Sequence, residues 1–174
     1  MALLALAGCQ PASGPRPVPS VAQNGADLKC ASGDDPFEDQ QAGWGFCHPG
    51  SWKYQEHSQP VQGPTGLDLV LDVVNDPCGR TGCTPGEGDF ALMIISTYER
   101  GSASSLSDWL RTNLKSAPTF EPIAWANAQE AGQFKDGRRI ALTPNHVVVM
   151  DLHSGRLDLE AAMAPRLSTW KFLF

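Results

Sequence analysis

Three stretches of the sequence are patterned as β-strands, and they constrain the fold more than any other feature. Residues 66–74 (GLDLVLDVV) alternate apolar with mostly acidic side chains, as a strand with one buried face does. Residues 89–98 (DFALMIISTY) are almost continuously apolar, which is typical of a central strand buried on both faces. Residues 146–153 (HVVVMDLH) give the strongest strand signal. A chain built on these segments places most of its core on a β-sheet.

Alternation and turn residues predict further strands between and around these three. Pro49-Gly50 and Asp136-Gly137 are typical turn pairs. The additional strands are predicted within residues 44–54, on both sides of the first turn, and at 123–129, 138–143 and 156–163. The ends are predicted differently: residues 22–43 as irregular chain and residues 167–174 as a helical turn that closes the sheet.

The sequence predicts one main helix, at about residues 105–116. Ser105 and Asp108 have the spacing of a capping box, with Asp in place of the usual Glu. The apolar residues that follow recur at helical spacing: Leu106, Trp109, Leu110 and Leu114. Because strands outnumber this helix and tight turns join them, the predicted fold class is α+β, an antiparallel β-sheet with one main helix packed on it.

The first residues of the chain resemble a targeting signal. Residues 1–8 are apolar and end in small residues, as the end of a signal peptide does. Leu6-Ala7-Gly8-Cys9 resembles a bacterial lipobox, whose cysteine receives a diacylglyceryl group. The resemblance implies lipidation and palmitate at Cys9, and a membrane-anchored protein in the bacterial cell envelope that faces the periplasm or the cell exterior. The alternative is an ordinary N-terminus in which the tetrapeptide occurs by chance.

The segment behind Cys9 supports the lipoprotein interpretation. Residues 11–20 are rich in Pro, Ser and Gly, a composition that is typical of a tether and does not supply a core. The remaining chain is long and apolar enough for one domain, since 41% of the 174 residues are hydrophobic. The predicted organisation is a signal-peptide remnant at 1–8, the lipidated cysteine and tether at 9–29, and a single α+β domain at 30–174.

The cysteine count points to disulfides. The chain has five cysteines, and four remain once Cys9 is assigned to lipidation: Cys30, Cys47, Cys78 and Cys83. An even remainder in an exported protein suggests two bonds, with three possible pairings. The turn-forming residues between Cys78 and Cys83 favour a local bond there, which leaves Cys30 to pair with Cys47. The alternative is a zinc site that uses Cys47, His48, Cys78 and Cys83, but the paired spacing of a zinc ribbon is missing.

Side chains that could support catalysis are present but lack a recognisable arrangement. The candidate bases are His48, His57, His146 and His153. Cys47 and His48 are adjacent on a predicted strand and therefore point to opposite faces. Asp151 and His153 share a face and could be a metal pair, but no third ligand is evident. Phosphate-binding-loop, serine-hydrolase and zinc-protease motifs do not occur in the sequence. The sequence therefore predicts no catalytic residue, no cofactor and no metal ligand.

The charge balance excludes one class of partner. The formal net charge is −6 and no basic stripe is visible, so a nucleic acid is not expected as a partner. The acidic cluster is interpreted as a solvated loop: Asp34, Asp35, Glu38 and Asp39. The aromatic residues are expected in the core, with a ligand groove as the alternative: Trp44, Phe46, Trp52, Tyr54, Trp109 and Trp125.

The order of segments resembles the PsbP-like and Mog-like families. Residues 49–52 (PGSW) match an early Pro-Gly-x-Trp turn, and residues 89–110 match a buried strand that leads into a Ser-Leu-x-x-Trp-Leu helix. Residues 170–172 (WKF) match the Trp-Lys-Phe that ends a β-meander. The first family is named for an extrinsic subunit of photosystem II and the second for a Ran-binding protein. The resemblance implies an α+β sandwich over about residues 45–174 and a role as an accessory subunit.

The combined interpretation is a lipid-anchored envelope lipoprotein that acts as a non-enzymatic binding or accessory module. Its expected partners are the membrane, through Cys9, and an envelope protein or a small ligand. The alternative is a membrane-anchored hydrolase that depends on Cys and His or on a metal. Convergence of His146, His153 and Asp151 with a cysteine in one pocket would favour the hydrolase. Scattered positions together with an exposed aromatic or apolar patch would favour the binding module.

Overall fold

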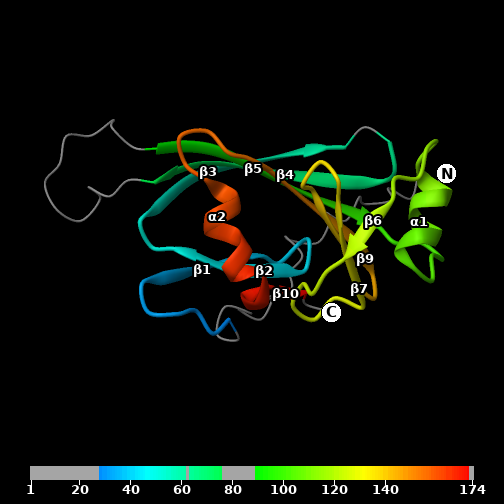
Figure 1. The fold of residues 1–174 in the computed structure, drawn as a ribbon, viewed down its shortest axis with the longest axis horizontal. Coiled ribbons are helices and arrows are strands. Elements are labelled where there is room, and N and C mark those ends of the chain that lie inside the picture. Colours follow the sequence, from blue (N-terminus) through cyan, green and yellow to red (C-terminus); the bar gives the residue numbers. More distant parts are fainter. Residues whose placement is uncertain (1–27, 62, 76–88, 173–174) are drawn as a thin grey trace, which may run out of the picture.

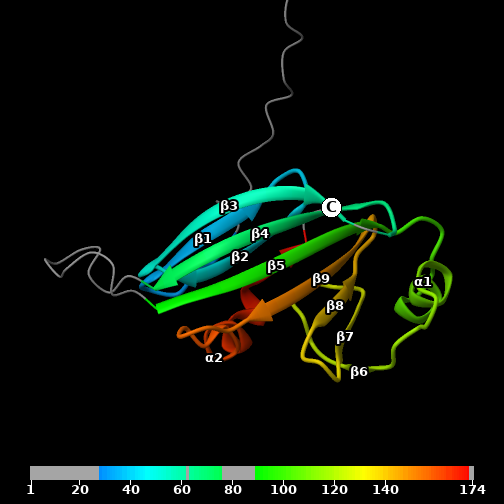
Figure 2. The same cartoon turned by 90° about the horizontal axis from the view of Figure 1, so that it is seen from above.

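The computed structural model describes residues 28–61, 63–75 and 89–172, and it is dominated by antiparallel β-structure. The larger sheet has seven strands in the spatial order β3-β4-β5-β9-β8-β7-β6, and every neighbouring pair is antiparallel. Figure 2 looks down on this sheet. Its strands are β3 (Trp52–Pro60), β4 (Gly66–Asn75), β5 (Asp89–Glu99), β6 (Phe120–Pro122), β7 (Glu130–Phe134), β8 (Arg139–Leu142) and β9 (His146–His153).

A smaller sheet lies beneath the larger one. It has three strands in the order β1-β2-β10: β1 (Asp34–Asp39), β2 (Trp44–Pro49) and β10 (Lys171–Phe172). Figure 1 shows the two layers edge-on, with the short helix α2 (Leu159–Met163) between them on one side. A 3₁₀ helix, η2 (Ala164–Thr169), leads from α2 to β10. The inner face of the larger sheet is therefore covered by segments from both ends of the described chain.

The two faces of the seven-stranded sheet carry two separate cores. The main core lies on the inner face, where Trp44 of the smaller sheet donates from its indole Nε1 to Thr97 Oγ1 of β5 at 2.9 Å. The second core lies on the opposite face, where α1 (Leu106–Asn113) covers β8 and the start of β9. Alternation along β8 serves both cores, because Ala141 faces the main core while its neighbours Ile140 and Leu142 face α1.

The predicted fold class holds at the level of a sheet-dominated α+β-like arrangement, but the single main helix is corrected to two short ones. Helix α1 has the expected cap, since the Ser105 hydroxyl accepts from the Asp108 backbone N–H at 3.1 Å. It ends at Asn113 because Leu114 adopts an extended conformation. The second helix, α2, occupies part of residues 156–163, which were expected to form a strand.

Other expectations fail where tertiary contacts override the local pattern. Residues 34–39 form strand β1 although the segment was expected to be irregular. Residues 123–129 are not a strand: the chain turns at Ala126, whose φ of 47° is in the left-handed region. Residues 167–174 were expected to be a helical turn, and over the described part they comprise the end of η2 followed by strand β10. The strands predicted within 44–54 and at 66–74, 138–143 and 146–153 are confirmed.

Candidate functional site

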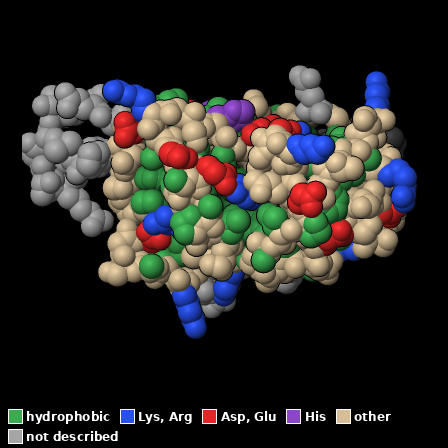
Figure 3. Space-filling view, viewed as in Figure 1, with side chains coloured by type: hydrophobic (Ala, Val, Ile, Leu, Met, Phe, Trp, Pro, Cys, Tyr) green, Lys and Arg blue, Asp and Glu red, His purple; other side chains and the backbone are tan. Residues whose placement is uncertain are grey.

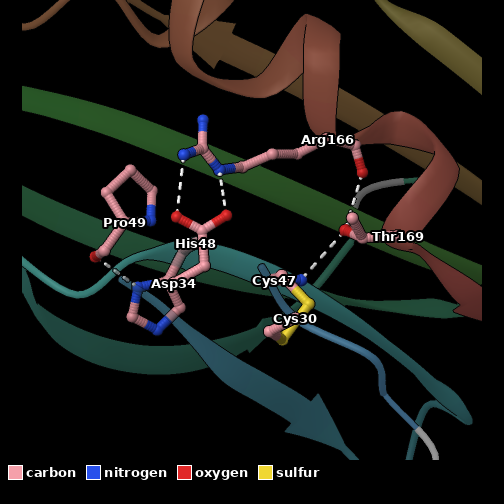
Figure 4. Close-up of a disulfide and its surroundings, with 7 residues drawn as sticks. All are labelled: Cys30, Asp34, Cys47, His48, Pro49, Arg166 and Thr169. Atoms are coloured by element: carbon pink, nitrogen blue, oxygen red, sulfur yellow. Dashed lines mark hydrogen bonds and ion pairs between the residues drawn. A yellow bond between two sulfur atoms is a disulfide. The ribbon is translucent and has the colours of Figure 1, made fainter. Parts of the chain in front are cut away.

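Cys30 and Cys47 form a disulfide, which is the pairing favoured from the sequence. The bond joins the segment before β1 to the middle of β2, with the two Cα atoms 5.4 Å apart (Figure 4). Cys9, Cys78 and Cys83 lie outside the described residues, so the lipidation and the second disulfide remain predictions.

Two further links hold the same region together (Figure 4). The backbone N–H of Cys47 donates to Thr169 Oγ1 at 3.1 Å, and this hydroxyl in turn donates to the Arg166 carbonyl at 2.7 Å. The Arg166 guanidinium donates to both carboxylate oxygens of Asp34, from Nε and from Nη2, each at 2.8 Å. Together with the disulfide, these contacts tie η2 to the first two strands. We call this set of contacts the disulfide clamp.

A cavity of about 800 Å³ lies beside the disulfide clamp. The clamp and the cavity share Thr169, and Lys29 enters the lining one residue before Cys30. We call it the Lys29–Lys171 groove. Its described lining comes from three separate parts of the sequence: Lys29, Ala124, Ala126, Asn127, Ser168, Thr169, Trp170 and Lys171.

Hydrogen bonds and aromatic packing shape the groove. The Asn127 carboxamide exchanges two hydrogen bonds with the backbone of Phe172, donating from Nδ2 to the carbonyl at 3.0 Å and accepting from the N–H at 2.9 Å. Behind this contact, Trp125 packs edge-on against Trp170 with ring centroids 5.1 Å apart. Both indole Nε1 atoms are buried and have no hydrogen-bond partner among the described residues. These contacts fix the shape of this wall of the groove.

The electrostatics of the groove differ from those of the chain as a whole. The net charge of the chain is −6, yet the described lining contains two lysines and no carboxylate. Ser168 adds an exposed hydroxyl. On the face of the molecule that carries α2, by contrast, acidic and basic side chains are interspersed (Figure 3). An electron-rich or anionic group is the ligand that such a lining suits.

The histidines do not converge. His48 is buried, stacks on Trp52 with centroids 5.9 Å apart, and places Nδ1 2.9 Å from the Pro49 carbonyl. His146 and His153 lie at opposite ends of β9. The fourth, His57, is exposed on β3.

Asp151 and His153, which could have been a metal pair, lie close together at the surface. His153 Nε2 lies 3.3 Å from Asp151 Oδ2. Within the ranges that the structure describes, no group of three or more His, Cys, Asp or Glu side chains is close enough to hold a metal ion. Cys47 is in the disulfide and lies on the smaller sheet, away from this pair. The conditions that would favour the hydrolase are therefore not met among these residues.

Most aromatic residues that could have lined a ligand groove are in the core. Trp44, Phe46, Trp52, Trp109 and Trp125 are buried, and of the six only Tyr54 is substantially exposed, at 40%. Strand β5 was expected to be buried on both faces, but its outer face is only half-covered. Phe90 on that face is 50% exposed.

Sequence reasoning missed the residues that line the groove. Lys29 and Ser168 stand in no motif and follow no periodicity, and Lys171 was noted only as part of the terminal WKF.

No helix in the described segments has the length and hydropathy needed to cross a bilayer. Comparisons with protein-family models, with curated proteins and with solved structures found no match.

Proposed function

We propose that this chain is a lipid-anchored envelope lipoprotein whose folded part is a non-enzymatic binding or accessory module, with the Lys29–Lys171 groove as its binding site. The observation that carries the proposal is the groove itself. Its volume of about 800 Å³ is in the range of small-ligand sites, and one of its lining residues, Thr169, is held by the disulfide clamp. The scattered histidines support binding over hydrolysis.

The anchor rests on the sequence around Cys9. The lipobox-like tetrapeptide and the Pro-rich segment behind it support lipidation, because several acyl chains on one cysteine hold a protein stably at a membrane. Lys29 stands close to the start of the described fold. The groove therefore lies near the point where the chain arriving from Cys9 enters the fold, and the folded part faces the periplasm or the cell exterior.

The accessory role rests on the resemblance to the PsbP-like and Mog-like families. Two stacked layers of antiparallel strands are compatible with a sandwich of that kind. In this form of the proposal, the partner is another protein of the envelope, and the groove or the exposed strand residues contact it.

The anchor is tested by labelling cells with palmitate. The gene is expressed with its natural upstream region, as wild type and as Cys9→Ser. We expect the substitution to abolish both the label and the membrane association. If wild type and Cys9→Ser are labelled equally, the lipoprotein assignment is refuted.

The binding site is tested by photocrosslinking in intact cells. A photoreactive residue replaces Ser168 in the groove or, as a matched control, Ser107, which is an exposed serine on α1. We expect crosslinked products from position 168 that are absent from position 107 and that diminish when Lys29→Gln is added. Identical patterns from the two positions would contradict a binding role for the groove.

A further inference from the structure

We propose that the outer side of strands β3, β4 and β5 docks a basic amphipathic helix of a partner protein. This is the side of the seven-stranded sheet that points away from the smaller sheet, next to the area that α1 covers (Figure 2). It shares no residue with the Lys29–Lys171 groove. The inference therefore goes beyond the proposed binding site and does not rest on it.

Alternation along the strands determines which side chains lie on this side of the sheet. Trp52, Leu71 and Met93 belong to the main core, so the residues next to them on each strand point the other way. The register then places outward residues of neighbouring strands directly opposite each other, as with Val74 and Phe90. We call the outward side chains within residues 53–59, 68–74 and 90–96 the β3–β5 outer face.

The centre of the β3–β5 outer face is apolar. Phe90 is 50% exposed, and Val74, Leu92 and Ile94 are partly exposed beside it. Val70, opposite Ile94, is buried. None of these five side chains belongs to either hydrophobic cluster of the described residues. A continuous apolar surface of this kind, left outside the cores, marks a place where another molecule packs.

Carboxylates lie among these apolar side chains. Asp68 and Asp72 are on β4, on either side of Val70, and Asp151 of β9 lies directly opposite Ile94. The Oδ1 atom of Asp68 is buried and has no hydrogen-bond partner among the described residues. A carboxylate oxygen shielded from water without a donor is unfavourable, so a donor supplied by a partner stabilises it.

The charge of the face selects a basic partner. Besides the three carboxylates, its outward strand positions and those at the end of β9 carry two histidines and one cation, Lys53, which lies opposite Val74. Arg138 borders the face on the side of α1 but is already paired with Asp136. Lys or Arg side chains of a partner can therefore pair with the carboxylates while its apolar side chains cover Phe90 and Ile94.

The shape of the face favours a helix, and its charge disfavours two other occupants. Helix α1 already packs on the neighbouring part of the same side, and a second helix beside it completes the layer. A second copy of this chain, docked through the same face, would bring two sets of the same carboxylates together. An anionic membrane surface would repel them.

The test measures peptide binding to the full chain with Cys9→Ser, which carries no acyl chains. The probe is a fluorescently labelled amphipathic peptide of Leu and Lys, and binding is followed by fluorescence anisotropy. One comparison peptide has Glu in place of Lys, and another has Ser in place of Leu. We expect the Leu–Lys peptide to bind and each comparison peptide to bind at least about ten-fold more weakly.

Substitutions on the face identify where the peptide binds. Phe90→Ser should weaken binding by about ten-fold, because a half-exposed ring is lost from the contact. Asp72→Asn should weaken it by about two- to five-fold. The matched controls are Tyr54→Ser and Glu56→Gln, which change an exposed aromatic and an exposed carboxylate on the other side of β3. Circular dichroism verifies that each variant is folded.

Several outcomes would overturn the proposal. It is wrong if the Leu–Lys peptide does not bind, if the Leu–Glu peptide binds as tightly, or if Phe90→Ser leaves binding unchanged. It is also wrong if Tyr54→Ser and Glu56→Gln weaken binding as much as the substitutions on the face do. Crosslinking from position 168 reports on the groove alone, so the proposed binding site stands or fails independently of these results.

Three further measurements identify a different occupant, and each of those results would also overturn the proposal. By analytical ultracentrifugation we expect a monomer, whereas a dimer that Phe90→Ser dissociates would place a second copy on the face. We expect no cosedimentation with vesicles of phosphatidylcholine and phosphatidylglycerol, whereas binding that Phe90→Ser removes would place a membrane there. If the Leu–Lys peptide binds only after residues 77–87 are replaced by a short Gly-Ser linker, that segment of the chain is the occupant.

Discussion

At the scale of single residues, a few side chains join parts of the chain that are distant in sequence. Arg166 and Asp34 make a bidentate pair in which both charged groups are largely shielded from solvent. Thr169 accepts from one backbone group and donates to another. With the disulfide, these contacts hold the smaller sheet against η2 and position the groove.

The Cys30–Cys47 bond is expected to stabilise the fold by about 3 kcal/mol, because it closes a loop with a sequence separation of 17 residues in the unfolded chain. The double variant Cys30→Ala/Cys47→Ala should have a free energy of unfolding lower by this amount. Urea denaturation of the two proteins, each without reductant, measures the difference. Equal free energies would show that the bond does not constrain the unfolded chain.

Both tyrosines of the chain are expected to ionise above the usual pKa of 10.0. Burial raises the pKa of Tyr98 and of Tyr54, and the charges of Glu56 and Asp35 raise that of Tyr54 further. Because its pKa is raised in the folded state, each neutral tyrosine contributes to the free energy of unfolding. This contribution is complete below about pH 10 and is lost as the pH rises through the folded-state pKa. Tyrosinate absorbance should therefore appear at higher pH in the native protein than in denaturant. If the tyrosinate absorbance of the native and of the denatured protein has the same midpoint pH, this prediction is wrong.

At the scale of elements, sequence patterns succeeded where neighbouring residues determine the structure. Residues 66–74 alternate because β4 packs one face into the main core, whereas Val70 is the only buried residue on its other face, and Ser105 with Asp108 caps α1 as expected. Residues 156–163 show why other predictions failed. Their apolar residues alternate, but Leu159 and Met163 are also four apart, and Asp158 caps a helix by accepting from the Ala161 N–H at 3.0 Å. Packing against the main core selects the helix.

Strand β7 is expected to depend on the absence of a side chain at Gly132. A Cβ there would overlap the ring of Phe120 on the neighbouring strand β6. Gly132→Ala should therefore destabilise the protein by about 1–3 kcal/mol, because the ring has to move out of a packed position. Chemical denaturation measures this cost.

The control for Gly132→Ala is the same substitution in a Phe120→Ala background. Removing the ring removes the overlap, so the second substitution should then cost much less. If Gly132→Ala costs the same with and without the ring, the contact with Phe120 is not the cause.

At the scale of the whole molecule, two meanders, β3-β4-β5 and β6-β7-β8-β9, join through the pairing of β5 with β9. Segments from both ends of the described chain then cover the inner face (Figure 1). The Lys29–Lys171 groove lies where these ends meet the loop at residues 124–127. No local pattern could have predicted it, because its residues become neighbours only when both layers are assembled.

The separation into two cores predicts that α1 can open without the rest of the molecule. Trp109 is buried in the second core, contacts Tyr98 and donates from Nε1 to the Glu99 carbonyl at 3.0 Å. The buried residues of this core include none from β1, β2 or β10. Trp109→Ala should therefore destabilise the second core by about 3–5 kcal/mol while leaving the disulfide clamp in place.

Hydrogen exchange followed by mass spectrometry measures this difference segment by segment. In Trp109→Ala we expect faster exchange in α1 and β8 and unchanged exchange in β2. Trp170→Ala is the control, because Trp170 packs against Trp44 and Phe46 in the main core and its loss should accelerate exchange in β2 as well. If Trp109→Ala accelerates exchange in β2 as strongly as in α1, the two cores unfold as one cooperative unit, and the groove cannot persist while α1 opens.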